Sequence, residues 1–299
     1  EKYYLKAVQI NNKSAIAHLN LGACYKEKLE LEKAIFHTEI AIKLDSKLEN
    51  SYLNLATIYN QIGDYNKSFE YAKEEISNDK NSELGYQLIS ELIKKIEPKR
   101  FLDENNRELI KNILNRKDIS HRELFRTINN LVPTKVLERL SVPYFDLNDN
   151  REFSIIKKDK VLIKALSLII FCSPLWEKAL RNIRKIMLLN YSEKENISDN
   201  VLNFTIALGE QCFLNEYVYY VSDEENSKLE ELKKSIQLNN RNQDYKLSLI
   251  SCYQSLSSIN NKIINLTNYK PIHKEFNKLL DSQFREITIE NNLANKIKK

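Results

Sequence analysis

The feature that most constrains this chain is a period of 34 residues within positions 1–97. Residues of the same class occupy matching positions in two consecutive units. The clearest pairs are Leu21 and Leu55, Gly22 and Ala56, Tyr25 and Tyr59, and Ala34 and Ser68. Large apolar and small residues at fixed places in a unit of this length are typical of a helix-turn-helix that stacks on its own copies. One such unit cannot bury its apolar side alone, so adjacent units have to pack together.

The period and the residue pattern are those of the tetratricopeptide repeat (TPR), which forms an α-solenoid. Matches continue on both sides of the two full units. Ala7 and Ile10 match Ala41 and Leu44, and Tyr86, Ile89 and Ile93 match Tyr52, Leu55 and Tyr59. The sequence therefore predicts a TPR array over residues 1–97, made of a partial repeat, two full repeats and another partial repeat. Because residues 1–11 match only the second helix of a unit and position 1 is Glu, we expect both ends to be cut from a longer protein.

The repeat pattern stops at Pro98, because proline cannot continue a helix and residues 99–106 are mostly polar. We therefore predict an irregular multi-helix region over residues 98–299, which ends at the edge of a missing C-terminal domain. Only 4 Gly and 5 Pro occur in 299 residues, which favours long helices and makes the whole chain all-α. A capping box, Ser120 and Glu123, begins the second helix of this region. Helices are predicted near residues 103–115, 120–131, 158–171, 175–190, 198–220, 224–238, 245–255 and 272–281.

Charge and composition exclude several classes of partner. The net charge of +5 comes from 46 basic and 41 acidic residues, and the basic runs are short and interrupted, so no nucleic-acid partner is predicted. The longest apolar run, residues 161–171, is too short to cross a bilayer and contains Lys164, which indicates a core helix and no membrane partner. Four widely separated cysteines indicate free thiols in a reducing compartment, so we expect a cytoplasmic protein.

Few residues offer catalytic, cofactor or metal chemistry. The four glycines stand apart, so no Gly-rich loop for a nucleotide or dinucleotide is predicted. The four histidines lie on separate predicted elements and lack the paired spacing of a metal site. His18 occupies a repeat position that usually holds an aromatic residue, so packing is preferred over catalysis as its role. No catalytic, cofactor-binding or metal-binding residue is predicted in this chain.

The most distinctive segment outside the repeats is residues 204–219. In one interpretation, Cys212 is a nucleophile in a polar site with Glu210, Gln211, Asn215 and Glu216. In the other, Cys212 belongs to the apolar stripe of one helix, and the polar residues contact neighbouring helix ends. A catalytic thiol needs a base or another means of lowering its pKa, and no histidine is near in the sequence. The structural role is therefore preferred, and we predict that Cys212 is buried.

The sequence ALGEQCFLNEYVYYVSDEE at residues 207–225 resembles a stretch of bacterial TPR-containing S-adenosylmethionine-dependent methyltransferases, a group that includes protein-lysine methyltransferases. The similarity extends to PLWEKALRNIRKIMLLNY at residues 174–191 and to the repeats before it. In that family the helical region lies between the repeats and a catalytic Rossmann-like domain, or packs around that domain. The resemblance implies a parent enzyme that uses S-adenosylmethionine, with its catalytic domain beyond residue 299 and no cofactor site within this chain.

Two functions of different classes follow. In the first, the chain is the non-catalytic TPR and helical region of a larger methyltransferase, serving protein–protein interaction, substrate recruitment or domain packing. In the second, it is a free-standing TPR adaptor with no enzymatic domain. That the chain is itself an enzyme is least favoured, because no catalytic constellation is found. A strand and a Gly-rich loop encoded after residue 299 would favour the first, and a stop codon the second.

Either function predicts a protein or peptide partner, and a homo-oligomer is compatible with both. In TPR geometry the first helix of each unit lines the groove. The predicted groove residues are Leu19, Asn20, Ala23, Lys26, Leu53, Asn54, Thr57, Asn60, Gln87 and Glu91. Asn20 and Asn54 recur at one repeat position, where their amides either hold a peptide backbone or bond to the neighbouring helix. The candidates for contact with another domain are Glu210, Gln211, Asn215 and Glu216.

Overall fold

The computed structural model describes residues 1–147, 150–193, 196–238 and 242–285. Within these ranges the regular structure is helical and contains no strand, which confirms the all-α prediction; one isolated bridge joins Asn260 and Ile264. The chain folds into two compact units. Unit 1 comprises Glu1–Asp103 and Asn115–Thr127, and unit 2 comprises Glu104–Leu114 and Ile128–Lys299. Unit 1 therefore contains the segment with the 34-residue period together with two short segments that follow it.

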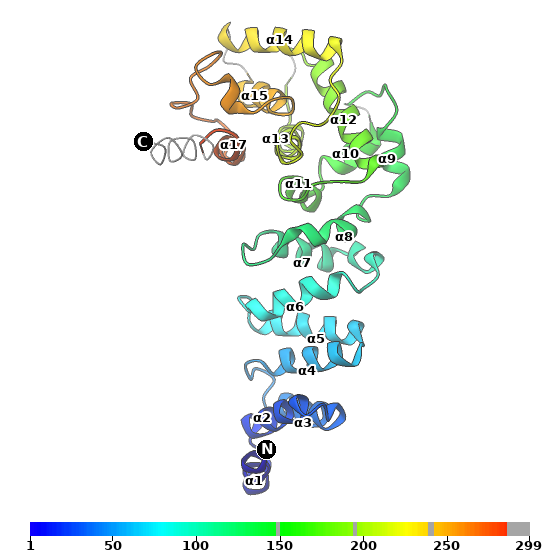
Figure 1. The fold of residues 1–299 in the computed structure, drawn as a ribbon, viewed down its shortest axis with the longest axis vertical. Helices are drawn as coiled ribbons and strands as arrows, with labels where there is room; N and C mark the ends of the chain where they lie inside the picture. The colour runs from blue at the N-terminus through cyan, green and yellow to red at the C-terminus, as the bar shows by residue number, and fades with distance from the viewer. Residues whose placement is uncertain (148–149, 194–195, 239–241, 286–299) are drawn as a thin grey trace, which may run out of the picture. The chain divides into compact units, whose positions relative to one another are not determined.

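In unit 1, the first six α-helices pack in chain order, each of the first five on the helix that follows it (Figure 1). They are α1 (Lys2–Ile10), α2 (Ala15–Glu27), α3 (Leu31–Leu44), α4 (Ser51–Ile62), α5 (Tyr65–Asn78) and α6 (Glu83–Ile93). Ser14, Asp64 and Ser82 cap α2, α5 and α6, because each side-chain oxygen accepts a hydrogen bond from the backbone N–H three residues on. Two short 3₁₀ helices, Pro98–Leu102 and His121–Leu124, complete the unit.

The helices of unit 1 repeat along the chain. Helix α5 begins and ends 34 residues after α3. Leu29 and Gly63 lie at the same place in the turns before these two helices. The backbone N–H of each of these residues donates a hydrogen bond to the carbonyl three residues before it. The backbone N–H of the next residue donates a hydrogen bond to the carbonyl five residues before that residue. Both have a left-handed backbone, with φ of 61° at Leu29 and 87° at Gly63, which suits glycine and strains leucine.

Small residues allow the paired helices of unit 1 to pack closely. Gly22 on α2 faces α3, and a Cβ atom at this position would lie only 2.4 Å from Thr38 Oγ1. In the next pair, the fully buried Ser68 on α5 donates a hydrogen bond of 2.7 Å to the carbonyl of Ala56 on α4. Helices α2 and α4 also contact each other, as do α4 and α6. The first helices of successive pairs are thus neighbours.

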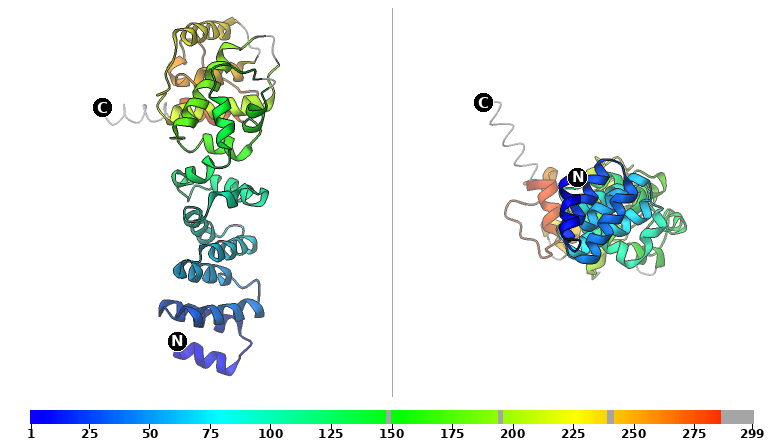
Figure 2. Two further views of the ribbon diagram at one scale, coloured as in Figure 1. Left: turned by 90° about the vertical axis from the view of Figure 1, so that its right-hand side faces the viewer. Right: turned by 90° about the horizontal axis from the view of Figure 1, so that it is seen from below.

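Unit 2 is built around α13, which contacts α11, α15 and α17 (Figure 1 and Figure 2). Its helices are α7 (Glu104–Leu114), α9 (Thr134–Leu140), α10 (Arg151–Ile156), α11 (Lys160–Leu166), α12 (Pro174–Leu189), α13 (Asp199–Leu214), α14 (Asp223–Leu238), α15 (Gln243–Ser251), α16 (Leu256–Ile259) and α17 (Phe276–Leu280). A π-helical turn, Asp281–Arg285, follows α17, and α8 (Phe125–Asn129) leads from unit 1 into unit 2. Trp176, the only tryptophan of the chain, is fully buried in this unit.

Three helices of unit 2 are clearly shorter than predicted. The helix predicted over residues 272–281 covers only Phe276–Leu280. The helix predicted over residues 198–220 ends at Leu214, because Glu216 and Tyr217 adopt left-handed φ angles of 57° and 59°. The Tyr217 N–H donates a hydrogen bond of 2.8 Å to the carbonyl of Cys212 at this helix end. Such a helix end usually contains a glycine, but neither Glu216 nor Tyr217 is glycine. The helix predicted over residues 158–171 covers only Lys160–Leu166.

The capping box predicted at Ser120 does not form. The Ser120 side chain caps no helix, and a 3₁₀ turn, His121–Leu124, follows it instead of an α-helix. The same sequence pattern does form a capping box at the start of α14. There Ser222 N–H donates to Glu225 Oε2 at 2.9 Å, and Glu225 N–H donates to Ser222 Oγ at 3.3 Å. The pattern alone therefore does not decide which serine begins an α-helix.

Candidate functional site

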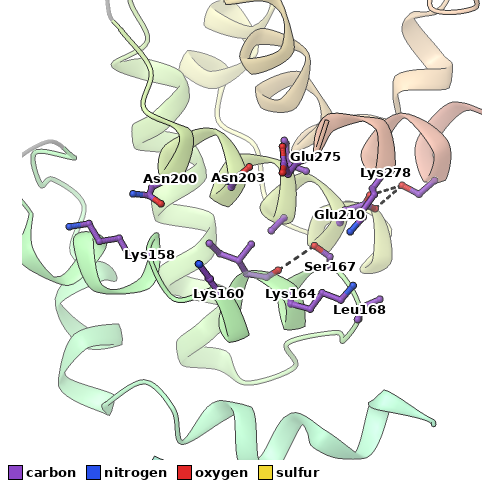
Figure 3. A pocket seen from close by; sticks show the side chains of 14 residues that line it. Lys158, Lys160, Lys164, Ser167, Leu168, Asn200, Asn203, Glu210, Glu275 and Lys278 are labelled. Carbon is purple, nitrogen blue, oxygen red and sulfur yellow. Dashed lines mark hydrogen bonds between the residues drawn. The ribbon is translucent and has the colours of Figure 1, made fainter. Parts of the chain in front are cut away.

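A cavity of about 470 Å³ opens in unit 2 between α11, α13 and the segment that contains α17 (Figure 3). Its apolar wall consists of Ile163, Leu168, Ile206 and Ala207. The last two lie on α13 and are nearly buried. A volume of this size is typical of sites for small organic molecules. We call it the lysine cavity, after the four residues Lys158, Lys160, Lys164 and Lys278 that line it.

The four lysines come from two parts of the chain. Lys160 and Lys164 lie one turn apart on α11, whereas Lys278 lies on α17. Among the described residues, none of the four ammonium groups has an ion-pair or hydrogen-bond partner. Burial lowers the pKa of Lys164, and the nearby charge of Lys278 lowers it further. The cavity therefore concentrates positive charge beside an apolar wall.

Glu210, one of the predicted domain-contact residues, lies at this cavity. Its carboxylate accepts hydrogen bonds of 2.7 and 2.8 Å from the Ser282 hydroxyl (Figure 3). Gln283, the next residue, donates to the carbonyl of Gly209 at 2.9 Å. These bonds fasten the turn after α17 to the middle of α13. The sequence motif gave no indication of this partner, because Ser282 is 72 residues from Glu210.

The other three predicted domain-contact residues have different environments. Gln211 is fully buried, and its amide nitrogen and oxygen have no hydrogen-bond partner in the described part of the chain. Asn215 is half-buried and caps the end of α13, and Glu216 is exposed. Contact between these residues and another domain stays a prediction.

Cys212 is fully buried, as predicted. It lies beside Cys252 and the guanidinium of Arg184. Burial disfavours its thiolate, but the hydrogen bond with Cys252 and the Arg184 charge favour it, and the pKa of Cys212 is lowered. Burial and Cys212 together raise the pKa of Cys252 well above its usual value. The sequence did not indicate that Arg184, 28 positions earlier, lies beside this thiol. Because the thiol is closed off from solvent, its burial supports the structural role.

The predicted groove residues lie on α2, α4 and α6 of unit 1, and several are already engaged. Lys26 donates a hydrogen bond of 2.9 Å to Asn54 Oδ1, which joins α2 to α4, and Asn54 is only 9% exposed. This is the alternative in which the amide bonds to a neighbouring helix. Other side-chain contacts of the set are Thr57 with the Asn54 carbonyl at 2.8 Å, Lys26 with Thr57 at 3.5 Å, Lys95 with Asn60 at 3.1 Å, and Gln87 with Glu83 at 3.0 Å.

Other groove residues are more available to a ligand. Leu19, Asn20 and Ala23 on α2 are half-buried, and Glu91 on α6 is exposed, whereas Leu53 on α4 is buried. The two asparagines of the repeat position therefore differ, because Asn54 is nearly covered and Asn20 is not. The groove stays a prediction, and its open part lies on α2.

Unit 1 also contains a pair of histidines that the sequence did not connect. His18 Nδ1 lies 3.0 Å from His37 Nδ1, and His18 Nε2 lies 3.2 Å from the carbonyl of Asn12. A carbonyl only accepts, so Nε2 of His18 holds a proton and its Nδ1 accepts from His37 Nδ1–H. Burial and the His18 ring together lower the pKa of His37. His18 is 4% exposed, which supports the packing role.

The described ranges contain neither a cluster of metal-ligating side chains nor a helix that could span a membrane. No group of three or more His, Cys, Asp or Glu side chains in them is placed to hold a metal ion. None of the helices described combines the length and the apolar character needed to cross a bilayer. Comparison of the sequence with protein-family models and with curated proteins finds no match.

Proposed function

We propose that unit 1 is a TPR array and that it binds another polypeptide. The main support is the recurrence of the same helix and turn after 34 residues, in α3 and α5 and at Leu29 and Gly63. The contacts of α2 with α4 and of α4 with α6 also agree with a stack in which first helices line one face. Such a face is a common site for extended or helical peptides.

The open part of α2 is the best candidate for that contact. Asn20 offers an amide donor and acceptor, and the small Ala23 leaves room for a ligand one turn further along. Asn54 is a weaker candidate, because its Oδ1 already accepts from Lys26. The proposal therefore centres on Asn20 and Ala23.

Peptides selected from a random phage-displayed library test this proposal. We expect the selected peptides to bind residues 1–299 and to lose at least about tenfold in affinity with Asn20→Ala or Ala23→Arg, on the scale of one lost buried hydrogen bond or a blocked contact. Phe36→Arg is the matched control, because Phe36 is 59% exposed on α3. Loss of binding with Phe36→Arg but not with Ala23→Arg would place the ligand elsewhere and contradict the groove.

For the whole chain, we propose the non-catalytic region of a larger S-adenosylmethionine-dependent methyltransferase. This rests on the resemblance of residues 174–191 and 207–225 to that family. Both segments lie in unit 2, and Glu216, within the second of them, is exposed. We propose a cytoplasmic location, because all four cysteines are unpaired. A TPR adaptor without an enzymatic domain is the second candidate, and it requires only unit 1.

Calorimetry separates the two candidates. Titration of S-adenosylmethionine into residues 1–299 should release no heat of binding, because close backbone approach to such a cofactor selects clustered glycines, and here the four are isolated. A protein translated from the same reading frame beyond residue 299 should bind it if the methyltransferase proposal is right. Binding by residues 1–299 alone would overturn the assignment of a non-catalytic region. No binding by the extended protein would favour the adaptor.

A further inference from the structure

The lysine cavity of unit 2 has two features that neither proposed function uses. One is the apolar wall formed by Ile163, Leu168, Ile206 and Ala207. The other is a set of ammonium groups without carboxylate partners in the described ranges. An apolar surface next to unpaired positive charge is complementary to a molecule that has both an apolar body and an anionic group.

Lys164 and Lys278 are the lysines best placed to hold such an anion. They lie on different helices, α11 and α17, and Figure 3 shows both among the residues that line the cavity with Glu210. Lys164 is half-buried, and the positive charge of Lys278 is nearby. A bound anion would remove the repulsion between the two ammonium groups and replace the water that Lys164 has lost. Ion pairs in a partly desolvated site are stronger than those at an open surface.

The charge of the cavity also limits the charge of the ligand. Glu210 and Glu275 line the same cavity as the four lysines, so two negative groups partly offset the positive ones. The Glu210 carboxylate is held by hydrogen bonds from the Ser282 hydroxyl. A group with one negative charge therefore fits this site better than a multiply charged one.

We propose that the lysine cavity binds a small amphipathic carboxylate, whose apolar body lies on the wall of the cavity and whose carboxylate is paired by Lys164 and Lys278. The cavity is large enough for a short acyl chain or an aromatic acid. The occupant is a small molecule, because the cavity lies within one unit and is closed on one side by Ile206 and Ala207.

Decanoate is the probe, and calorimetry on residues 1–299 is the measurement. Decanoate should bind, acetate should not, and decanol should bind at least about tenfold more weakly, because it lacks the charge. Decyl phosphate distinguishes the headgroups: binding tighter than that of decanoate would overturn the preference for a carboxylate. Equal affinity for decanol and decanoate would overturn the role of the lysines.

Variants locate the site. Lys164→Gln with Lys278→Gln should weaken decanoate binding at least about tenfold. The matched control is Lys135→Gln with Lys262→Gln, which removes the same charge from exposed positions outside the cavity. Leu168→Gln at the half-open wall should also weaken binding without unfolding the unit, since its side chain is already 37% exposed. An unchanged Trp176 fluorescence transition in urea confirms that each variant is folded.

Three results would overturn the proposal. Decanoate binding that survives the Lys164 and Lys278 changes would show that the cavity is not the site. A loss of the same size in the Lys135 and Lys262 control would show a general effect of charge. Absence of decanoate binding in the wild-type chain at millimolar concentration would also overturn it.

Discussion

Units 1 and 2 are both helical, but their cores are built differently. In unit 1 each helix packs on its neighbour in the sequence, and small residues such as Gly22 and Ser68 set the distance. In unit 2 the core includes charged groups from distant segments. Arg184 on α12 is 1% exposed, Glu225 on α14 is 2% exposed, and they lie 3.5 Å apart. Local contacts that repeat leave a period in the sequence, whereas a single long-range contact leaves none.

The buried arginine of unit 2 illustrates the second kind of core. Arg184 donates to the carbonyls of Tyr220 at 2.9 Å and Cys252 at 3.3 Å. Its guanidinium also lies 4.1 Å from the centre of the Tyr253 ring, and the Tyr253 hydroxyl donates to Glu225 at 2.9 Å. Four segments of the chain therefore meet at one side chain. The comparison predicts that unit 2 depends on a few polar residues and that unit 1 depends on close packing.

The largest expected effect is on Arg184. Arg184→Met should lower the free energy of unfolding of unit 2 by about 3–5 kcal/mol, because it leaves the Glu225 carboxylate buried without its charge partner. Trp176 fluorescence in urea measures this unit alone, since no other tryptophan is present. Lys185→Met is the control on the same helix, where the ion pair with Glu224 is exposed and the loss should stay below about 1 kcal/mol. Similar losses for both variants would contradict the comparison.

Close packing in unit 1 is tested at Gly22. Gly22→Ala should destabilise α2 and α3 by about 1–3 kcal/mol, because the new Cβ meets Thr38 Oγ1, which is held by its bond to the Ala34 carbonyl. Amide hydrogen exchange of these helices measures the loss in unit 1. The double variant with Thr38→Ala should recover part of it. No loss in Gly22→Ala would mean that the helices separate easily and that packing distance does not set the fold.

Substitutions at the two equivalent turns of unit 1 should change stability by smaller amounts and in opposite directions. Leu29→Gly should stabilise the α2–α3 pair by about 1 kcal/mol, because the left-handed backbone that strains leucine is free for glycine. Gly63→Ala should destabilise the α4–α5 pair by a similar amount, although no atom lies within 4 Å of the added Cβ. Hydrogen exchange distinguishes the two pairs. If both substitutions act in the same direction, the turns are not equivalent.

The smallest expected effect is a pH dependence limited to unit 1. The folded state lowers the pKa of His37, so the unfolded chain binds the proton more readily. The stability from the histidine pair is therefore complete above an unfolded pKa of about 6.5 and is lost as the pH falls below it. Protection factors of α2 and α3, corrected for intrinsic exchange, should fall between pH 7.5 and 5. In His37→Leu the protection factors should not fall over this pH range. If they fall as much as in the wild-type chain, groups other than His37 cause the pH dependence.

The candidate sites were predictable only in part. The sequence placed Asn20 and Ala23 on a first helix of unit 1, because repeat position fixes helix position. It also contained Lys160 and Lys164 one turn apart, a spacing that puts both charges on one side of α11. It gave no sign that Lys278 joins them, because that contact spans more than a hundred residues. The cavity exists only once α11, α13 and α17 are packed.

The sequence by itself determined the all-α class and the paired helices of unit 1. These features depend on interactions within one or two helical turns or between adjacent helices, so residue type and spacing specify them. Only the tertiary structure decided where α13 ends and how α4 begins. Asn50 does not cap α4; instead Glu75 on α5 accepts a hydrogen bond of 3.1 Å from the Leu53 N–H. Such a cap depends on which helix lies alongside, and spacing within one helix does not contain that information.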